Sequence, residues 1–185
     1  NVVARRTIAT SGSRGHSVKA RVGNLRPDER YFYRFETRHR NSPVGRFQTA
    51  LPMDSNRPVK FAFFSCNEYT HGYFNAFELM ARDDIDFVVC LGDYIYGDAY
   101  HSVAGGTGVR DDAIGEPNPQ NPSIVSEALS LADYRAKYAL YRSDKALREL
   151  HARFPMVAIW DDHEIQDNYA GDAQGGGLDP AKRWS

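Results

Sequence analysis

Three short apolar runs in the second part of the chain have the pattern of buried parallel strands, which are usually covered on both faces. They are residues 59–64, 87–91 and 157–160. Between them, apolar residues recur at helical spacing over residues 73–82 and residues 126–150, and the second stretch is interrupted near residues 143–144. Strands that alternate with helices predict an α/β fold built from βαβ units.

The chain before these runs alternates polar and apolar positions, as strands with one buried face do. The alternating segments are residues 17–22, 31–36 and 44–49. Turn-rich connections separate them, and the Leu25-x-Pro27 element resembles the corner of a fibronectin-type domain. We therefore expect residues 1–51 to be the carboxy-terminal part of an all-β, fibronectin-like sandwich, residues 52–58 a linker, and residues 59–185 the α/β part.

Composition and charge exclude several classes of protein. Lysine and arginine number 23 and aspartate and glutamate 24, so no strong net field favours nucleic acid or an anionic membrane. No apolar stretch approaches the roughly 20 residues that span a bilayer. Two cysteines make no disulfide framework. Cys90 is interpreted as a small buried apolar residue, and a single bridge to Cys66 stays open as an alternative.

Reactive side chains follow all three apolar runs. They are Cys66 and Asn67 after the first, Asp93 and Tyr96 after the second, and Asp161, Asp162 and His163 after the third. In α/β proteins the carboxyl ends of parallel strands meet at the edge where ligands bind. A thiolate, carboxylates, a phenol and an imidazole at one edge predict a metal site, and such a site indicates hydrolysis of a phosphate ester.

Asp93 and Tyr96 suit a strongly Lewis-acidic cation. A carboxylate at a strand end can bridge two cations, and Gly92 lets the chain turn close to them. A free phenol has a pKa of about 10, so a phenolate ligand near neutral pH indicates ferric iron. The alternative is that Tyr94 and Tyr96 are aromatic residues of the core or its rim.

The acidic string after the third run has two interpretations. In the first, Asp161 or Asp162 binds a cation, and His163 faces the substrate and exchanges a proton. In the second, the string is a charged surface turn, or a helix start that one of the aspartates caps. Cys66 is likewise either a thiolate ligand or a buried structural cysteine.

Three separated segments, taken in order, resemble one known family. The segments are Phe63-Phe64-Ser65-Cys66, Leu91-Gly92-Asp93-Tyr94-Ile95-Tyr96 and Trp160-Asp161-Asp162-His163-Glu164. They resemble the alkaline phosphatase D (PhoD) family, which belongs to the metallophosphoesterases. The segments that begin at Ser42, Tyr73 and Leu131 are similar as well, so the resemblance covers residues 17–171.

The resemblance implies a metallophosphoesterase α/β sandwich behind a small β domain, and hydrolysis of phosphate monoesters or diesters with ferric iron (Fe³⁺) and calcium (Ca²⁺). It implies that Asp93 is a bridging ligand and Tyr96 a phenolate ligand, and that Cys66 stands where relatives have an aspartate ligand. It also implies that Asp162 binds the second metal, with Asp161 as a substitute, and that His163 orients or protonates the leaving group. Asn67 is a further candidate for contact with metal or substrate, and export to the periplasm or the outside of the cell is implied.

The histidines that complete the metal shell in the superfamily have no counterpart here, because only His163 falls in a motif. The chain opens on Asn1 without a methionine and ends at Ser185 in a predicted loop, so we expect a piece of a longer protein. Alone, it is expected to be marginally folded and inactive on its small-molecule phosphate esters. The rival interpretation is a catalytically inactive calcium-binding or carbohydrate-associated module.

Overall fold

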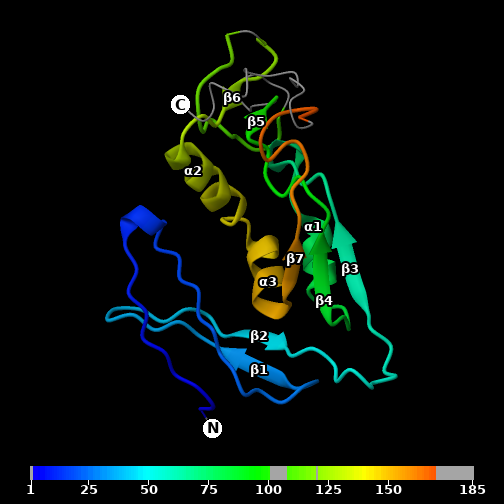
Figure 1. Ribbon diagram of the computed structural model, residues 1–185. Helices are drawn as coiled ribbons and strands as arrows, with labels where there is room; N and C mark the ends of the chain where they lie inside the picture. Colours follow the sequence, from blue (N-terminus) through cyan, green and yellow to red (C-terminus); the bar gives the residue numbers. More distant parts are fainter. Residues whose placement is uncertain (1, 101–107, 120, 170–185) are drawn as a thin grey trace.

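The computed structural model describes residues 2–100, 108–119 and 121–169 (Figure 1). Its second part is built on a three-stranded parallel sheet with the order β3-β4-β7. The strands are β3 (Phe61–Phe64), β4 (Phe87–Cys90) and β7 (Met156–Ala158). The register pairs Phe64 with Cys90 and Cys90 with Ala158, so all three strands end at the same edge of the sheet. The predicted α/β fold is confirmed, and each strand is shorter than its apolar run.

The described residues form three α-helices, and the last two begin at side-chain caps. They are α1 (Asn75–Met80), α2 (Leu131–Tyr141) and α3 (Lys145–Arg153). Ser130 and Asp133 form a reciprocal capping box at the start of α2. The carboxylate of Asp144 accepts two backbone N–H groups at the start of α3, so the predicted break near residues 143–144 is confirmed and has a local cause.

One face of the sheet is packed and the other is open. Helices α1 and α3 cover the packed face, where Val88 and Cys90 are fully buried (Figure 1). On the opposite face Phe61, Phe63 and Val157 remain 53%, 61% and 57% exposed. The sequence predicted strands covered on both faces. Within the described residues that prediction is wrong for the outer face, because no described element packs against it.

Among residues 2–51 the structure describes a single strand pair. Strands β1 (Arg30–Tyr33) and β2 (Gly45–Gln48) are antiparallel, with Tyr31 opposite Phe47. These are two of the three predicted strands. Residues 17–22 form no strand and are largely exposed, because no described strand pairs with them. A fibronectin-like sandwich is therefore not confirmed.

Polar contacts fasten this strand pair to the rest of the molecule. The Nε–H of Arg46 on β2 donates to the carbonyl oxygen of Arg153 at the end of α3 over 3.0 Å. Arg57, in the predicted linker, forms ion pairs with Asp28 at 3.2 Å and with Asp86 at 2.9 Å. The linker is thus tied to the segments on both sides of it, and the predicted domain boundaries stay a prediction.

The long connection between β4 and α2 is anchored by buried polar groups. It includes β5 (Asp98–Ala99) and β6 (Ser126–Glu127), which pair antiparallel. The Nζ atom of Lys137 on α2 lies 2.9 Å from Oδ2 of Asp112, and their side chains are 0% and 1% exposed. The described part of this connection is therefore fixed to α2.

Three smaller expectations concern cysteines, the membrane and the tail. Cys90 is buried, as predicted, and both Cys66 and Cys90 are free thiols, so the alternative of a bridge is wrong. Among the described residues, no helix combines the length and apolar character that crossing a membrane requires. The loop predicted at Ser185 lies outside the described residues.

Candidate functional site

Tight turns follow β3 and β4, and both use an unusual backbone conformation. Cys66 has a φ of 56° and Asp93 a φ of 51°, in the left-handed region that non-glycine residues seldom adopt. Gly92 has a φ of 116°, and a Cβ atom there would lie 2.4 Å from the Cβ atom of Asp161. Only glycine therefore allows the loops after β4 and β7 to approach this closely. Such strained positions cluster at functional sites.

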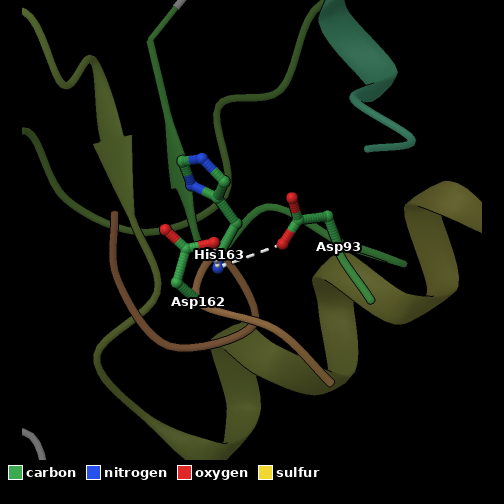
Figure 2. Close-up of side chains that lie close together, drawn as sticks. All are labelled: Asp93, Asp162 and His163. Atoms are coloured by element: carbon green, nitrogen blue, oxygen red, sulfur yellow. Dashed lines mark hydrogen bonds between the residues drawn. The ribbon is translucent and has the colours of Figure 1, made fainter. Parts of the chain in front are cut away.

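These two loops bring three potential ligands together. One ligand atom from each of Asp93, Asp162 and His163 lies within 4.8 Å of the others. Figure 2 shows the two carboxylates on either side of the His163 main chain, whose N–H donates to Oδ1 of Asp93 at 3.2 Å. Burial raises the pKa of the Asp93 carboxyl, while His163 and the Cys66 thiol act to lower it. A cation here would offset the cost of burying this charge.

A buried carboxylate orients the His163 ring. Asp98 is fully buried, and its Oδ1 atom lies 3.1 Å from Nδ1 of His163. Oδ2 of Asp98 accepts the N–H of Asp167 at 3.0 Å and the hydroxyl of Tyr100 at 3.2 Å. Burial opposes the imidazolium charge, but the hydrogen bond and charge of Asp98, with the charges of Asp162 and Asp93, outweigh it and raise the pKa of His163 to about 9.

Tyr96 lies against the same histidine. Its ring stacks on the His163 ring with 4.2 Å between centroids and 28° between planes. Its backbone N–H donates to the hydroxyl of Tyr141 at 3.1 Å, and Tyr141 also accepts the N–H of Tyr69 at 3.2 Å. Burial, followed by the charge of Asp93, raises the pKa of the Tyr96 phenol. Without a nearby cation, this environment keeps the phenol protonated.

The other predicted site residues lie around this cluster. The Cys66 side chain is exposed and is not one of the three residues grouped above. Asn67 is 6% exposed, and its backbone N–H donates to the carbonyl oxygen of Asp93 at 3.0 Å. Its Nδ2 atom is buried and has no hydrogen-bond partner among the described residues. Asp161 is exposed, and its backbone N–H bonds to Glu164 at 2.8 Å.

Two family models match this chain. Residues 61–184 match the family model of PhoD-like phosphatases, and residues 1–51 match the model of the N-terminal domain of PhoD-like phosphatases. The chain belongs to the PhoD-like phosphatase family. The resemblance read from the three motifs is therefore confirmed.

Two relatives show how much of a PhoD-like protein is present. The chain is 40% identical, over 173 residues, to alkaline phosphatase D of Bacillus subtilis (strain 168). The aligned region covers 91% of this chain and 27% of that protein. It matches a solved structure of PhoD with a TM-score of 0.77 and 40% identity, over 92% of this chain and 31% of the other. The match supports the α/β fold, and the chain spans less than a third of either relative.

The sequence did not single out three residues that shape this PhoD-like site. They are Asp98, Tyr141 and Glu164. Gly97-Asp98 repeats the Gly-Asp pair of Gly92-Asp93 five residues later, which was an available signal. Glu164 stood inside the acidic motif without a role. Tyr141 lies in the last turn of α2, where nothing local marks it, because its hydroxyl acts only across the tertiary fold.

Proposed function

We propose that this chain supplies part of the active site of a metal-dependent phosphate-ester hydrolase. The observation that carries the proposal is the grouping of Asp93, Asp162 and His163 at the shared edge of β4 and β7. Membership of the PhoD-like phosphatase family supports the same reaction. The substrates proposed are small-molecule phosphate monoesters or diesters.

The donor set fits hard cations. The site offers two carboxylates, and carboxylate oxygens are ligands that calcium and ferric iron prefer. The charge of Asp93 also acts on the phenol of Tyr96, where it helps to raise the pKa. We propose that Asp93, Asp162, Tyr96 and Cys66 would hold ferric iron and calcium. Bound there, the cations would supply Lewis-acid stabilisation of the phosphoryl oxygens.

Burial and contacts favour Asp162 over Asp161 as a metal ligand. Asp162 lies in the three-residue group, and its Oδ1 and Oδ2 atoms accept the backbone N–H groups of His163 and Asn168 at 3.0 Å and 2.5 Å. These contacts hold the Asp162 carboxylate in place at the site. Asp161 is exposed and lies outside the group, so Asp161 serves as the matched control below.

His163 and Asn67 are assigned to the substrate. Asp98 holds Nδ1 of His163 at 3.1 Å, and this contact fixes the ring in the orientation proposed for donating a proton to a leaving alkoxide. The buried Nδ2 of Asn67 has no partner among the described residues, which supports the proposal that it donates to a phosphoryl oxygen. Further metal ligands are proposed to come from outside residues 1–185, and export from the cytoplasm is proposed from family membership.

The test is hydrolysis of nitrophenyl phosphate and an alkyl phosphate by the intact protein and its variants. His163→Ala should lower turnover by ~100- to 10,000-fold, with the smaller loss on nitrophenyl phosphate, because nitrophenolate leaves without a proton. Asp162→Asn should lower bound metal and turnover, and Asp161→Asn should change neither. Absence of hydrolysis by the metal-loaded wild type would refute the proposal and favour a catalytically inactive module.

Residues 1–185 alone should show no appreciable hydrolysis, because part of the proposed metal shell lies outside them. Measured beside the intact protein with iron and calcium, turnover within about tenfold of the intact rate would show that the site is complete within this chain.

A further inference from the structure

Glu164 joins the two loops that carry the proposed ligands. Glu164 is only 7% exposed. Oε1 accepts the backbone N–H of Tyr94 at 2.6 Å, and Oε2 accepts the backbone N–H groups of Asp93 at 3.1 Å and Asp161 at 2.8 Å. One carboxylate therefore satisfies three buried or half-buried amides from segments about 70 residues apart in the chain.

The three amides lie at the points that determine the site geometry. The Asp93 and Tyr94 amides belong to the turn in which Asp93 has a φ of 51°, and the Asp161 amide precedes the ligand candidate Asp162. The close approach of Gly92 to Asp161 brings the same two loops together. The carboxylate of Glu164 thus fixes the peptide on each side of the gap between Asp93 and Asp162.

We propose that Glu164 is a positioning residue, which sets the spacing between Asp93 and Asp162 for cation binding without contacting the cation itself. This inference rests on the proposed metal-dependent function. Residues that hold ligands in place through hydrogen bonds typically change metal affinity or activity by ~10- to 100-fold when they are replaced. Glu164 acts on the backbone of the ligand residues, so it controls both loops at once.

Glutamine cannot replace this carboxylate. Its amide has one acceptor oxygen and one NH₂ group, and the NH₂ group would face at least one backbone N–H. If the oxygen stays with Asp93 and Asp161, the N–H of Tyr94 loses its acceptor, and in the flipped orientation two amides lose theirs. Glu164→Gln therefore keeps the volume of the side chain but loosens one loop from the other.

The experiment compares the intact wild-type protein with Glu164→Gln, with Glu164→Asp and with Glu149→Gln, which alters an exposed residue of α3. Calcium binding to metal-free protein is followed by calorimetry, thermal unfolding is recorded without metal, and hydrogen exchange is measured at the amides of Asp93, Tyr94 and Asp161.

Glu164→Gln should weaken calcium binding ~10- to 100-fold and speed exchange at those amides. Glu149→Gln should match wild type. Glu164→Asp is the second variant because it keeps the charge and withdraws both oxygens by one methylene; it should also bind calcium more weakly than wild type.

The outcomes separate this inference from the proposed function. If wild type binds calcium and a folded Glu164 variant binds it within about threefold of wild type, Glu164 is not a positioning residue, whatever its effect on thermal unfolding. A lower unfolding temperature with unchanged calcium affinity would also overturn the inference, because it shows a structural role only. If wild type does not bind calcium, the proposed calcium-dependent function itself is refuted, and the inference falls with it.

Discussion

Replacing Asp98 by asparagine tests how the structure orients His163. The two oxygens of Asp98 accept three donors: Nδ1 of His163 at 3.1 Å, the N–H of Asp167 at 3.0 Å and the hydroxyl of Tyr100 at 3.2 Å. Asparagine has one acceptor oxygen, so its NH₂ group must face either the imidazole or the Asp167 amide. If the NH₂ group faces the imidazole, the hydrogen bond to Nδ1 of His163 is lost. If it faces the Asp167 amide, that amide loses its acceptor, and His163 keeps only an uncharged one.

The expected loss follows from the strength of that bond. A hydrogen bond to a charged group contributes about 1.5–3 kcal/mol, and ~1.4 kcal/mol corresponds to tenfold in rate. Asp98→Asn should therefore lower turnover of an alkyl phosphate roughly 10- to 150-fold, with a smaller loss on nitrophenyl phosphate. The bound metal should stay at the wild-type level, since Asp98 is not in the grouped ligand set.

The assay is steady-state hydrolysis of both substrates by the intact protein, with metal content measured on the same samples. The control is Asp111→Asn, which makes the same chemical change at an exposed position of the same connection. Equal losses on the two substrates would refute the assignment of Asp98 to proton donation through His163. Loss of metal in Asp98→Asn would instead make Asp98 part of the metal shell.

Three further predictions address the iron ligand, the anchored loop and the pH range of stability. Tyr96→Phe should remove the visible charge-transfer absorption of the iron-loaded protein, and an unchanged band would exclude Tyr96 as a phenolate ligand. Lys137→Met leaves Asp112 buried without its partner and should cost about 3–5 kcal/mol in urea unfolding, whereas the double variant with Asp112→Leu should recover most of it; no recovery would contradict the ion-pair explanation. Burial, followed by the charge of Arg142, lowers the pKa of His151 from 6.5 to about 4, so the unfolded state binds more protons between these values and stability should fall as pH drops through that window. His151→Gln should flatten this dependence in thermal unfolding, the exposed-site control His39→Gln should not, and equal slopes would contradict it.

Local patterns along the chain were enough to predict the order of the elements and the residues that follow each strand. Apolar runs and helical spacing depend on neighbours within a few positions, so β3, β4, β7 and the helix break at Asp144 were visible without the fold. The edge of the sheet at which ligands bind could also be predicted, because the carboxyl ends of parallel strands lie together. Residues 17–22 alternate polar and apolar positions as a strand does, but they form no strand, since pairing depends on a partner outside the segment.

Which side chains meet depends on how the strands and helices pack in three dimensions. The pairing of β4 with β7 brings the ligand atoms of Asp162, and not those of Asp161, into one group with Asp93. It also brings the Glu164 carboxylate within hydrogen-bond distance of backbone amides in both loops. Asp98 reaches His163 across 65 positions, and the hydroxyl of Tyr141 reaches the turn at Tyr96 across 45. Contacts at such separations depend on sheet register and helix packing, which no local pattern of residues records.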